Sequence, residues 1–158
     1  MEEYDSDISM ISMNLEKYNI VIEDFINNNN IYKMCDVIYA MYNLGNHYND
    51  IKDYENMKKY YNMVIENNSI GCAYTDATYN LGLYYNNIKD YENMMKYYLK
   101  AIEMGHTYAM NNLGAYYMSI KDFENAKKYL IMGVKNKEVY ALYNLKKYYE
   151  CVSKNKKN

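Results

Sequence analysis

The sequence predicts an all-α fold, a solenoid of antiparallel helix pairs, and three observations support this. A related segment begins at Ala40, Ala77, Ala109 and Ala141, with spacings of 37, 32 and 32 residues. Such a period is typical of stacked supersecondary units. The 158-residue chain has no Pro and only six Gly, which disfavours a turn-rich β fold. Half of its residues are apolar, so it can bury a core.

We predict three regions along the chain. Residues 1–30 form an N-terminal capping helix and an Asn-rich loop, residues 31–150 hold the repeats, and residues 151–158 are a basic polar tail. The repeats span about 37–73, 74–105 and 106–137, with a partial copy at 138–150. The first helix is predicted from apolar residues spaced by three and four, which are Ile8, Ile11, Leu15, Tyr18, Ile22 and Phe25. It is too short for a coiled coil, so we expect it to cap the first repeat.

Each repeat is predicted to contain two helices, A and B, and the string KDYEN marks the start of helix B. KDYEN occurs at 52–56 and 89–93, and KDFEN at 121–125. Its Asp (Asp53, Asp90 and Asp122) suits an N-cap, and its Glu lies in the first turn, where negative charge favours the helix dipole. A ligand-binding motif is the alternative. The aromatic residues Tyr54, Tyr91 and Phe123 are expected to reach back over the preceding helix.

A glycine recurs inside each predicted helix A, at Gly45, Gly82 and Gly114. Glycine within a helix costs about 1 kcal/mol relative to Ala. We therefore expect the backbone of helix B to approach closely at these points. The fourth copy has Lys146 at this position, and the tail after it is too short for a helix B. The fourth copy is thus predicted to be a single terminal helix.

The repeated pattern resembles the Sel1-like subclass of tetratricopeptide repeats over about residues 37–150. It reads A-x-x-x-L-G-x-x-Y, then D-Y-E-x-A/M-x-x-Y-Y-x-x-A, then G-x-x-x-A from Gly105 to Ala109. The resemblance implies a right-handed superhelix that binds a protein partner or peptide along its concave, helix-A face. The chain departs from the family because the Gly-rich loop is reduced to Ile-Lys, Met57 and Met94 replace Ala, and the common Pro is absent.

The composition resembles that of repeat proteins of mimivirus-type giant viruses. The chain has 24 Tyr and no Arg, as A/T-rich codon usage would produce. Some of these proteins belong to the mimivirus virophage-defence system, whose family is linked with a helicase and a nuclease. The resemblance implies an adaptor in the host cytoplasm or the viral factory. Three separate cysteines fit reduced thiols in such a compartment.

The family's groove positions map onto four rows of residues. The rows are Tyr39, Asp76, Tyr108 and Tyr140; Tyr42, Tyr79, Asn111 and Tyr143; Asn43, Asn80, Asn112 and Asn144; and Asn46, Leu83, Ala115 and Lys147. Tyr gives broad contact area, and Asn offers a donor and an acceptor to a peptide backbone. The alternatives are that the Asn side chains bond within the repeats and that the Tyr side chains belong to the core.

The sequence shows no catalytic constellation, and we predict a protein without enzymatic activity, cofactor, metal or membrane span. His47 and His106 lie in different repeats, without metal-ligand spacing. We expect His106 to be solvated in a turn. Single-stranded nucleic-acid binding is an alternative function, because Tyr can stack on bases, but such binders also need a basic groove. The lysines here lie mainly in helix B and the tail.

The last predicted helix suggests self-association as a homodimer. Its residues Ala141, Leu142, Leu145 and Tyr149 have no following helix to cover them, and Leu142, Leu145 and Tyr149 are the predicted contacts. A two-fold dimer is the commonest closed assembly. Residues 1–30 carry a net charge of −6 and residues 127–158 carry +7, which would add attraction at contact distance. The helix of Ile8–Phe25 is the alternative interface.

Overall fold

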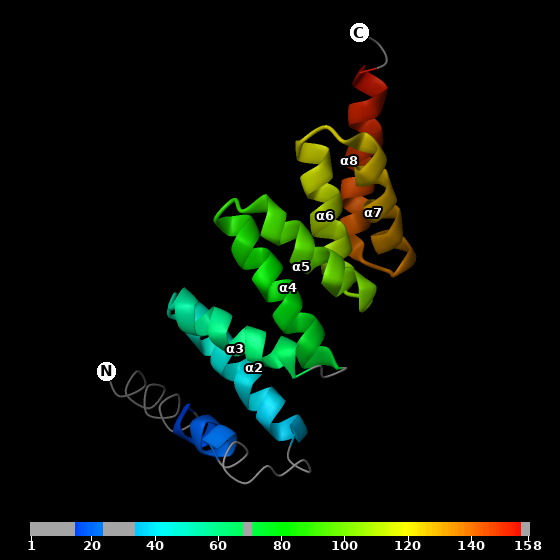
Figure 1. Cartoon of the computed structure of the whole chain (residues 1–158). Coiled ribbons are helices and arrows are strands. Elements are labelled where there is room, and N and C mark those ends of the chain that lie inside the picture. Colours follow the sequence, from blue (N-terminus) through cyan, green and yellow to red (C-terminus); the bar gives the residue numbers. More distant parts are fainter. Residues whose placement is uncertain (1–14, 24–33, 68–70, 156–158) are drawn as a thin grey trace, which may run out of the picture. The chain divides into compact units, whose positions relative to one another are not determined.

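The computed structural model describes residues 15–23, 34–67 and 71–155, and within them it contains helices and no strand (Figure 1). Residues 15–23 are helical, and the remaining parts of the predicted N-terminal helix lie outside the described residues. The further helices are α2 (Met34–Asp50), α3 (Tyr54–Glu66), α4 (Cys72–Asn87), α5 (Tyr91–Glu103), α6 (Thr107–Ser119), α7 (Phe123–Lys135) and α8 (Val139–Asn155). The predicted all-α solenoid class is confirmed.

The chain forms two compact units, residues 1–77 and residues 78–158. In the first unit α2 packs against α3, and in the second α6 packs against α7 (Figure 1). Helix α8 packs against both α6 and α7, the two helices of the preceding repeat, and no helix follows it among the described residues. The predicted two-helix repeat and the single terminal helix are therefore confirmed.

The three KDYEN-type strings begin α3, α5 and α7, as predicted. The carboxylate of Asp90 accepts hydrogen bonds from the backbone N–H of Asn93 at 3.1 Å and from its side-chain Nδ2 at 2.7 Å. Asp53 with Asn56 and Asp122 with Asn125 repeat this arrangement. Each Asp thus satisfies an N–H group that the first helical turn leaves without an intrahelical partner.

Two of the aromatic residues that follow these Asp residues, Tyr91 and Phe123, contact helix A of the next repeat, which the sequence did not predict. The ring of Tyr91 lies 5.1 Å from that of Tyr116 on α6, and the ring of Phe123 lies 6.2 Å from that of Tyr148 on α8. Each ring therefore joins helix B to helix A of the next repeat.

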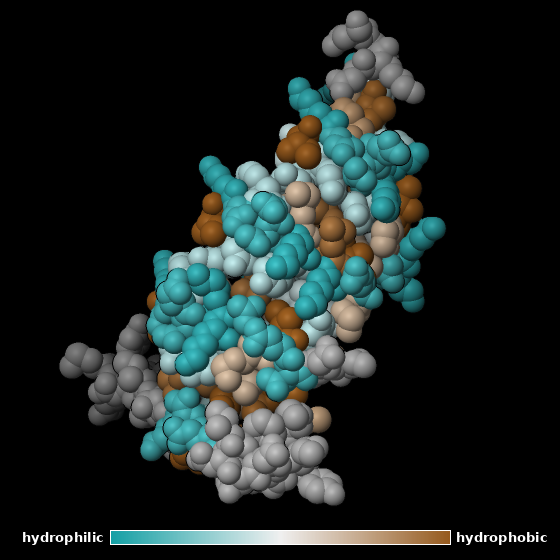
Figure 2. Space-filling view, in the orientation of Figure 1, coloured by the Kyte–Doolittle hydropathy of each residue, from teal (hydrophilic) through white to brown (hydrophobic). Residues whose placement is uncertain are grey.

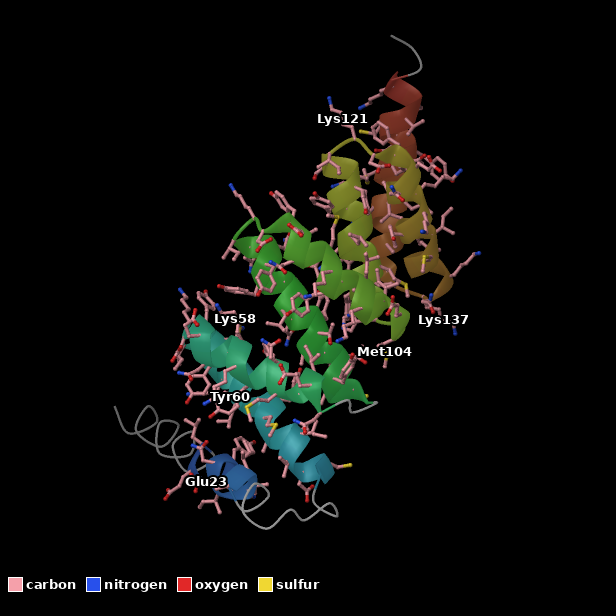
Figure 3. The ribbon with its side chains drawn as sticks, viewed as in Figure 1. Glu23, Lys58, Tyr60, Met104, Lys121 and Lys137 are labelled. Atoms are coloured by element: carbon pink, nitrogen blue, oxygen red, sulfur yellow. The ribbon has the colours of Figure 1, made fainter. Side chains whose placement is uncertain are left out.

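The Ile-Lys turns between helices A and B depend on lysine residues in the left-handed conformation. Lys89 has φ of 62°, and two hydrogen bonds close the end of α4 around it, from Lys89 N to Asn86 O at 3.1 Å and from Asp90 N to Tyr85 O at 2.9 Å. Lys52 and Lys121 repeat this turn, and Lys137 does so between α7 and α8 (Figure 3). Glycine usually occupies this position, because an L-residue there costs about 1–2 kcal/mol. No local pattern of residues predicts that lysine takes this position.

The three glycines inside helix A are sites of close approach, but a side chain of helix B, not its backbone, makes the nearest contact. A Cβ on Gly82 would lie 2.5 Å from ring carbon Cδ1 of Tyr98, and one on Gly45 would lie equally close to Tyr61. A Cβ on Gly114 would lie 2.7 Å from Cγ of Leu130. The expectation of backbone contact is corrected for Gly45 and Gly82, where only a buried side chain is close, whereas at Gly114 the backbone N of Leu130 would also lie 3.2 Å from the added Cβ.

Parallel tyrosine pairs add a second contact between helices A and B. Tyr48 stacks on Tyr60, Tyr85 on Tyr97 and Tyr117 on Tyr129, with ring centroids 5.5, 5.3 and 5.6 Å apart. The three interplanar angles are 8° or less. Each helix pair therefore has the same aromatic contact beside its glycine notch.

The C-terminal core covers part of the apolar stripe that was expected to be open on α8. Ala141 is fully buried, and a Cβ on Gly133 would lie 2.6 Å from its Cβ. The prediction that Ala141 is uncovered is therefore wrong. Leu145 is half-buried against the cluster of Ala126, Leu130 and Tyr148. Leu142 and Tyr149 remain exposed.

Replacing Gly82 with Ala should lower the free energy of unfolding by about 1–3 kcal/mol, because the ring of Tyr98 is buried and cannot move away from the new methyl group. Helix propensity alone would favour Ala by about 1 kcal/mol. Urea unfolding followed by circular dichroism measures the change. Gly71→Ala is the matched control, since a Cβ there meets no atom within 4 Å. Equal stability of the two variants would contradict the notch.

The three cap carboxylates should make the stability depend on pH in acid. Hydrogen bonds from the Asn93 side chain and backbone lower the pKa of Asp90, and the equivalent Asn lowers the pKa of Asp53 and Asp122. A folded pKa below the unfolded value of about 3.9 means that this stabilisation is present above about pH 4 and is lost as the pH falls through the folded pKa.

Changing all three Asp residues to Asn, which also caps helices well, should therefore flatten the fall of Tm in acid. The control changes Glu55, Glu92 and Glu124 to Gln, which removes equal charge from the same turns without removing the caps. This control should keep most of the wild-type acid dependence. An Asn variant with the wild-type pH profile would show that the caps do not titrate with folding.

Candidate functional site

Three of the predicted groove tyrosines form an exposed aromatic surface on the second unit. Tyr108 on α6 is 50% exposed, and Tyr140 and Tyr143 on α8 are 63% and 57% exposed. The ammonium group of Lys147 lies 4.5 Å from the centroid of the Tyr143 ring, so a positive charge accompanies the aromatic surface. We call Tyr108, Tyr140 and Tyr143 the tyrosine face. Figure 2 shows hydrophobic side chains among hydrophilic ones on the surface of this C-terminal part.

Tyr79, a fourth predicted groove tyrosine of the second unit, lies in internal packing. Its ring stacks on His106 at 4.1 Å and lies 5.9 Å from that of Tyr98. Burial raises the pKa of Tyr79, and that of Tyr98 to about 12, so both phenols stay neutral at physiological pH. For Tyr79 the structure thus corresponds to the alternative that placed tyrosine in the core.

His106 is a helix cap, and the prediction that it is solvated in a turn is wrong. Its Nδ1 accepts a hydrogen bond from the backbone N–H of Ala109 at 3.2 Å, which begins α6. Its ring lies between Tyr79 and Tyr108, with centroids 4.1 and 5.8 Å away. A cap that accepts through Nδ1 requires the neutral ring. The rings of Tyr79 and Tyr108 also lie 6.3 Å from each other, so the three side chains form one aromatic cluster that includes the exposed Tyr108.

The asparagines of the second unit form a hydrogen-bond chain across three successive A helices. Asn144 on α8 donates to Oδ1 of Asn111 at 2.9 Å, and Asn111 donates to Oδ1 of Asn112 at 3.2 Å. Asn112 in turn donates to the hydroxyl of Tyr79 on α4 at 3.1 Å. Among the described residues, no buried side-chain nitrogen or oxygen lacks a partner. Only the bond between Asn111 and Asn112 lies within one repeat, as the alternative predicted, and the bonds from Asn144 and to Tyr79 connect successive repeats.

A small polar pocket lies beside this chain of hydrogen bonds and shares Asn112 with it. Its volume is about 260 Å³, and its lining residues are Asn86, Tyr91, Asn112, Ala115, Tyr116 and Ser119. Asn112 and Ala115 were predicted groove residues, whereas Asn86, Tyr91, Tyr116 and Ser119 were missed. The spacing of 112, 115, 116 and 119 on one helix was the available signal. The pocket is smaller than most small-molecule sites and has no charged group, so it suits one neutral polar side chain or a peptide group.

The predicted groove residues of the first unit follow the same division between surface and core. Tyr39 is exposed, whereas the half-buried Tyr42 lies 6.2 Å from the ring of Tyr61. Asn46 accepts a hydrogen bond from the Tyr61 hydroxyl at 2.7 Å. The remaining groove residues of this unit and of α4 are half-buried, namely Asn43, Asp76, Asn80 and Leu83.

The described residues offer no obvious reactive centre. Residues 15–23, 34–67 and 71–155 contain no group of three or more His, Cys, Asp or Glu side chains that could hold a metal ion. Cys35, Cys72 and Cys151 are exposed and unpaired. Within the same residues, every helix is too short or too polar to cross a membrane.

A comparison with protein families gives one match. The model for the tetratricopeptide repeat matches residues 38–74, 75–104 and 107–131, which is more than half of the chain. No curated protein matches the sequence.

Replacing Asn111 with Ala should destabilise the second unit by about 1–3 kcal/mol, because the amide of Asn144 loses its acceptor and Asn112 loses its donor in a buried place. Asn144→Ala, at the end of the chain of amides, should cost about 1 kcal/mol. Urea unfolding of both single variants and the double variant measures their coupling. Strictly additive changes would show that the two amides do not interact.

Proposed function

Because the chain belongs to the tetratricopeptide repeat family, we propose that it is a non-catalytic scaffold that binds a protein partner on the tyrosine face. Repeats of this family generally mediate protein–protein interaction. One observation indicates where on this chain the partner binds. Each of Tyr108, Tyr140 and Tyr143 exposes at least half of its surface. Tyrosine is enriched at sites that dominate binding energy, because it buries a large area with few rotatable bonds.

The surroundings of the tyrosine face support an extended peptide as the bound segment. The polar pocket on α6 offers the amide of Asn86, which can donate to and accept from a peptide backbone, whereas the amide of Asn112 in the same pocket is bonded to Tyr79 and Asn111. Lys147 beside Tyr143 favours an acidic residue on the partner. The hydrogen-bond chain from Asn144 to Tyr79 joins α8, α6 and α4. Because these helices are already held together, binding should cost little further conformational entropy.

Single-stranded nucleic acid is the second candidate ligand, and the charge of the second unit favours it. Residues 78–158 contain 13 Lys and seven acidic residues, a net charge of +6. Many of these lysines lie on helix B, such as Lys96 and Lys100 on α5 and Lys127 and Lys128 on α7. Nucleic-acid binders of this kind need a groove of positive charge beside the stacking residues, and here Lys147 is beside Tyr143 but many other lysines lie on helix B, so we place a protein partner first.

The sequence resemblance supports a more specific form of the proposal. The KDYEN copies and the A/T-rich composition resemble Sel1-like proteins of mimivirus-type giant viruses. In that form the scaffold is an adaptor that holds a helicase and a nuclease in a virophage-defence complex.

The tyrosine face can be tested with peptides selected by the wild-type protein from a displayed random library. Tyr140→Ala combined with Tyr143→Ala should raise the Kd of the selected peptides at least about tenfold, as loss of two aromatic anchors does. The helical circular dichroism signal should not change, because both side chains are exposed. Fluorescence anisotropy measures the Kd.

Leu99→Ala is the control, since it removes an exposed apolar side chain from α5. Wild-type affinity of the double tyrosine variant would disprove this binding face. A labelled single-stranded oligonucleotide tests the second candidate, for which binding must weaken steeply with salt.

A further inference from the structure

Helix α8 exposes a face that is covered in each of the three complete repeats. Leu142 corresponds in the repeat to Met41, Thr78 and Met110. Those three residues are at most 3% exposed, whereas Leu142 is 59% exposed. A helix B follows helix A in each of those three repeats, whereas no helix follows α8 among the described residues.

Tyr149 is likewise exposed at a position where the three complete repeats bury or stack their residue. It corresponds to Tyr48, Tyr85 and Tyr117, each of which stacks on a tyrosine of helix B. In α8 this ring is 52% exposed, and it lines an open depression together with Leu142, Leu145, Lys146, Glu150 and Ser153. The face is therefore shaped and composed for a helix that packs on it.

Lys146 sets the chemistry of the occupant. It stands where Gly45, Gly82 and Gly114 form their notches, so a buried ring like that of Tyr98 cannot be accommodated there. An exposed ammonium group in the middle of an apolar face favours an amphipathic surface that carries acidic groups. Lys154 adds a second exposed cation to α8.

The chain itself supplies such a surface, because its charge is divided between its two units. Residues 1–77 contain 13 acidic residues and five Lys, a net charge of −8, and residues 78–158 have a net charge of +6. Pairing α8 with α8 of another copy would bring mainly like charges together, because α8 carries three Lys and one Glu. Pairing α8 with the first unit of another copy brings opposite charges together.

We propose that this chain forms a homodimer in which the open face of α8, centred on Leu142, Lys146 and Tyr149, docks on the acidic first unit of a second copy. Two-fold symmetry forms this contact twice and leaves neither α8 uncovered. The helix of residues 15–23 on the first unit carries Glu16 and Glu23, both exposed. Glu23 is labelled in Figure 3. The proposal is independent of the tyrosine face.

Sedimentation equilibrium of the full chain at low salt tests the dimer, with an expected mass twice the 19.0 kDa of one chain. One charge-reversal variant carries Lys146→Glu and Lys154→Glu on α8, and a second carries Glu16→Lys and Glu23→Lys on the first unit. Each variant alone should dimerise at least about tenfold more weakly than wild type, because like charges now meet. A mixture of the two should regain a dimer that contains one copy of each.

The matched control changes Lys127 and Lys135 of α7 to Glu, which alters the net charge equally on another helix and should leave dimerisation unchanged. Recovery in the mixture also proves that both variants fold. A wild-type protein that stays monomeric at high micromolar concentration overturns the proposal. It is likewise overturned if the first-unit variant dimerises normally, because α8 would then bind elsewhere, or if the mixture does not recover.

Discussion

The insertion of a helix-B side chain into a glycine notch of helix A determines how the repeats of this protein pack. Tyr61 and Tyr98 fill the notches of Gly45 and Gly82 so closely that a single methyl group would overlap the ring. This contact fixes the rotation of each helix about its own axis, since glycine and ring must face each other. The parallel tyrosine pairs one turn further along, such as Tyr85 with Tyr97, follow from the same rotation. The same rotation determines which side chains of helix A point outward, including those of the tyrosine face.

Much of the fold could be predicted from the sequence because it depends on local and repeated signals. The period, the helix pairs and the Asp caps each rest on residues a few positions apart, and the structure confirms them. The turns were less predictable. Glycine normally takes the left-handed position, and a lysine such as Lys89 carries no propensity that indicates it. The repeated pair of hydrogen bonds around it compensates for its conformational cost.

The candidate site was less predictable because it depends on which side chains meet across repeats. The family pattern places Tyr79 and Tyr143 in one row, but the neighbours of the two residues differ. His106 and Tyr98 lie against Tyr79, whereas no helix follows α8 among the described residues and Tyr143 is exposed. The same limit applies to His106, whose stacking partner is 27 positions away in the sequence. Row position therefore predicts the face of a helix but not the burial of a side chain.

Asparagine and tyrosine, both favoured by an A/T-rich composition, satisfy each other in this structure. A repeat protein that fills its core with tyrosine must find a partner for each buried hydroxyl, since a lone one would cost about 1–3 kcal/mol. Asn46 accepts from Tyr61, and Asn112 donates to Tyr79. Phenylalanine would fill the same notches without this requirement, but it would leave the amides of helix A without partners. The biased composition thus adds polar links between and within repeats that an aliphatic core would lack, and these links hold the helices that carry the exposed tyrosines.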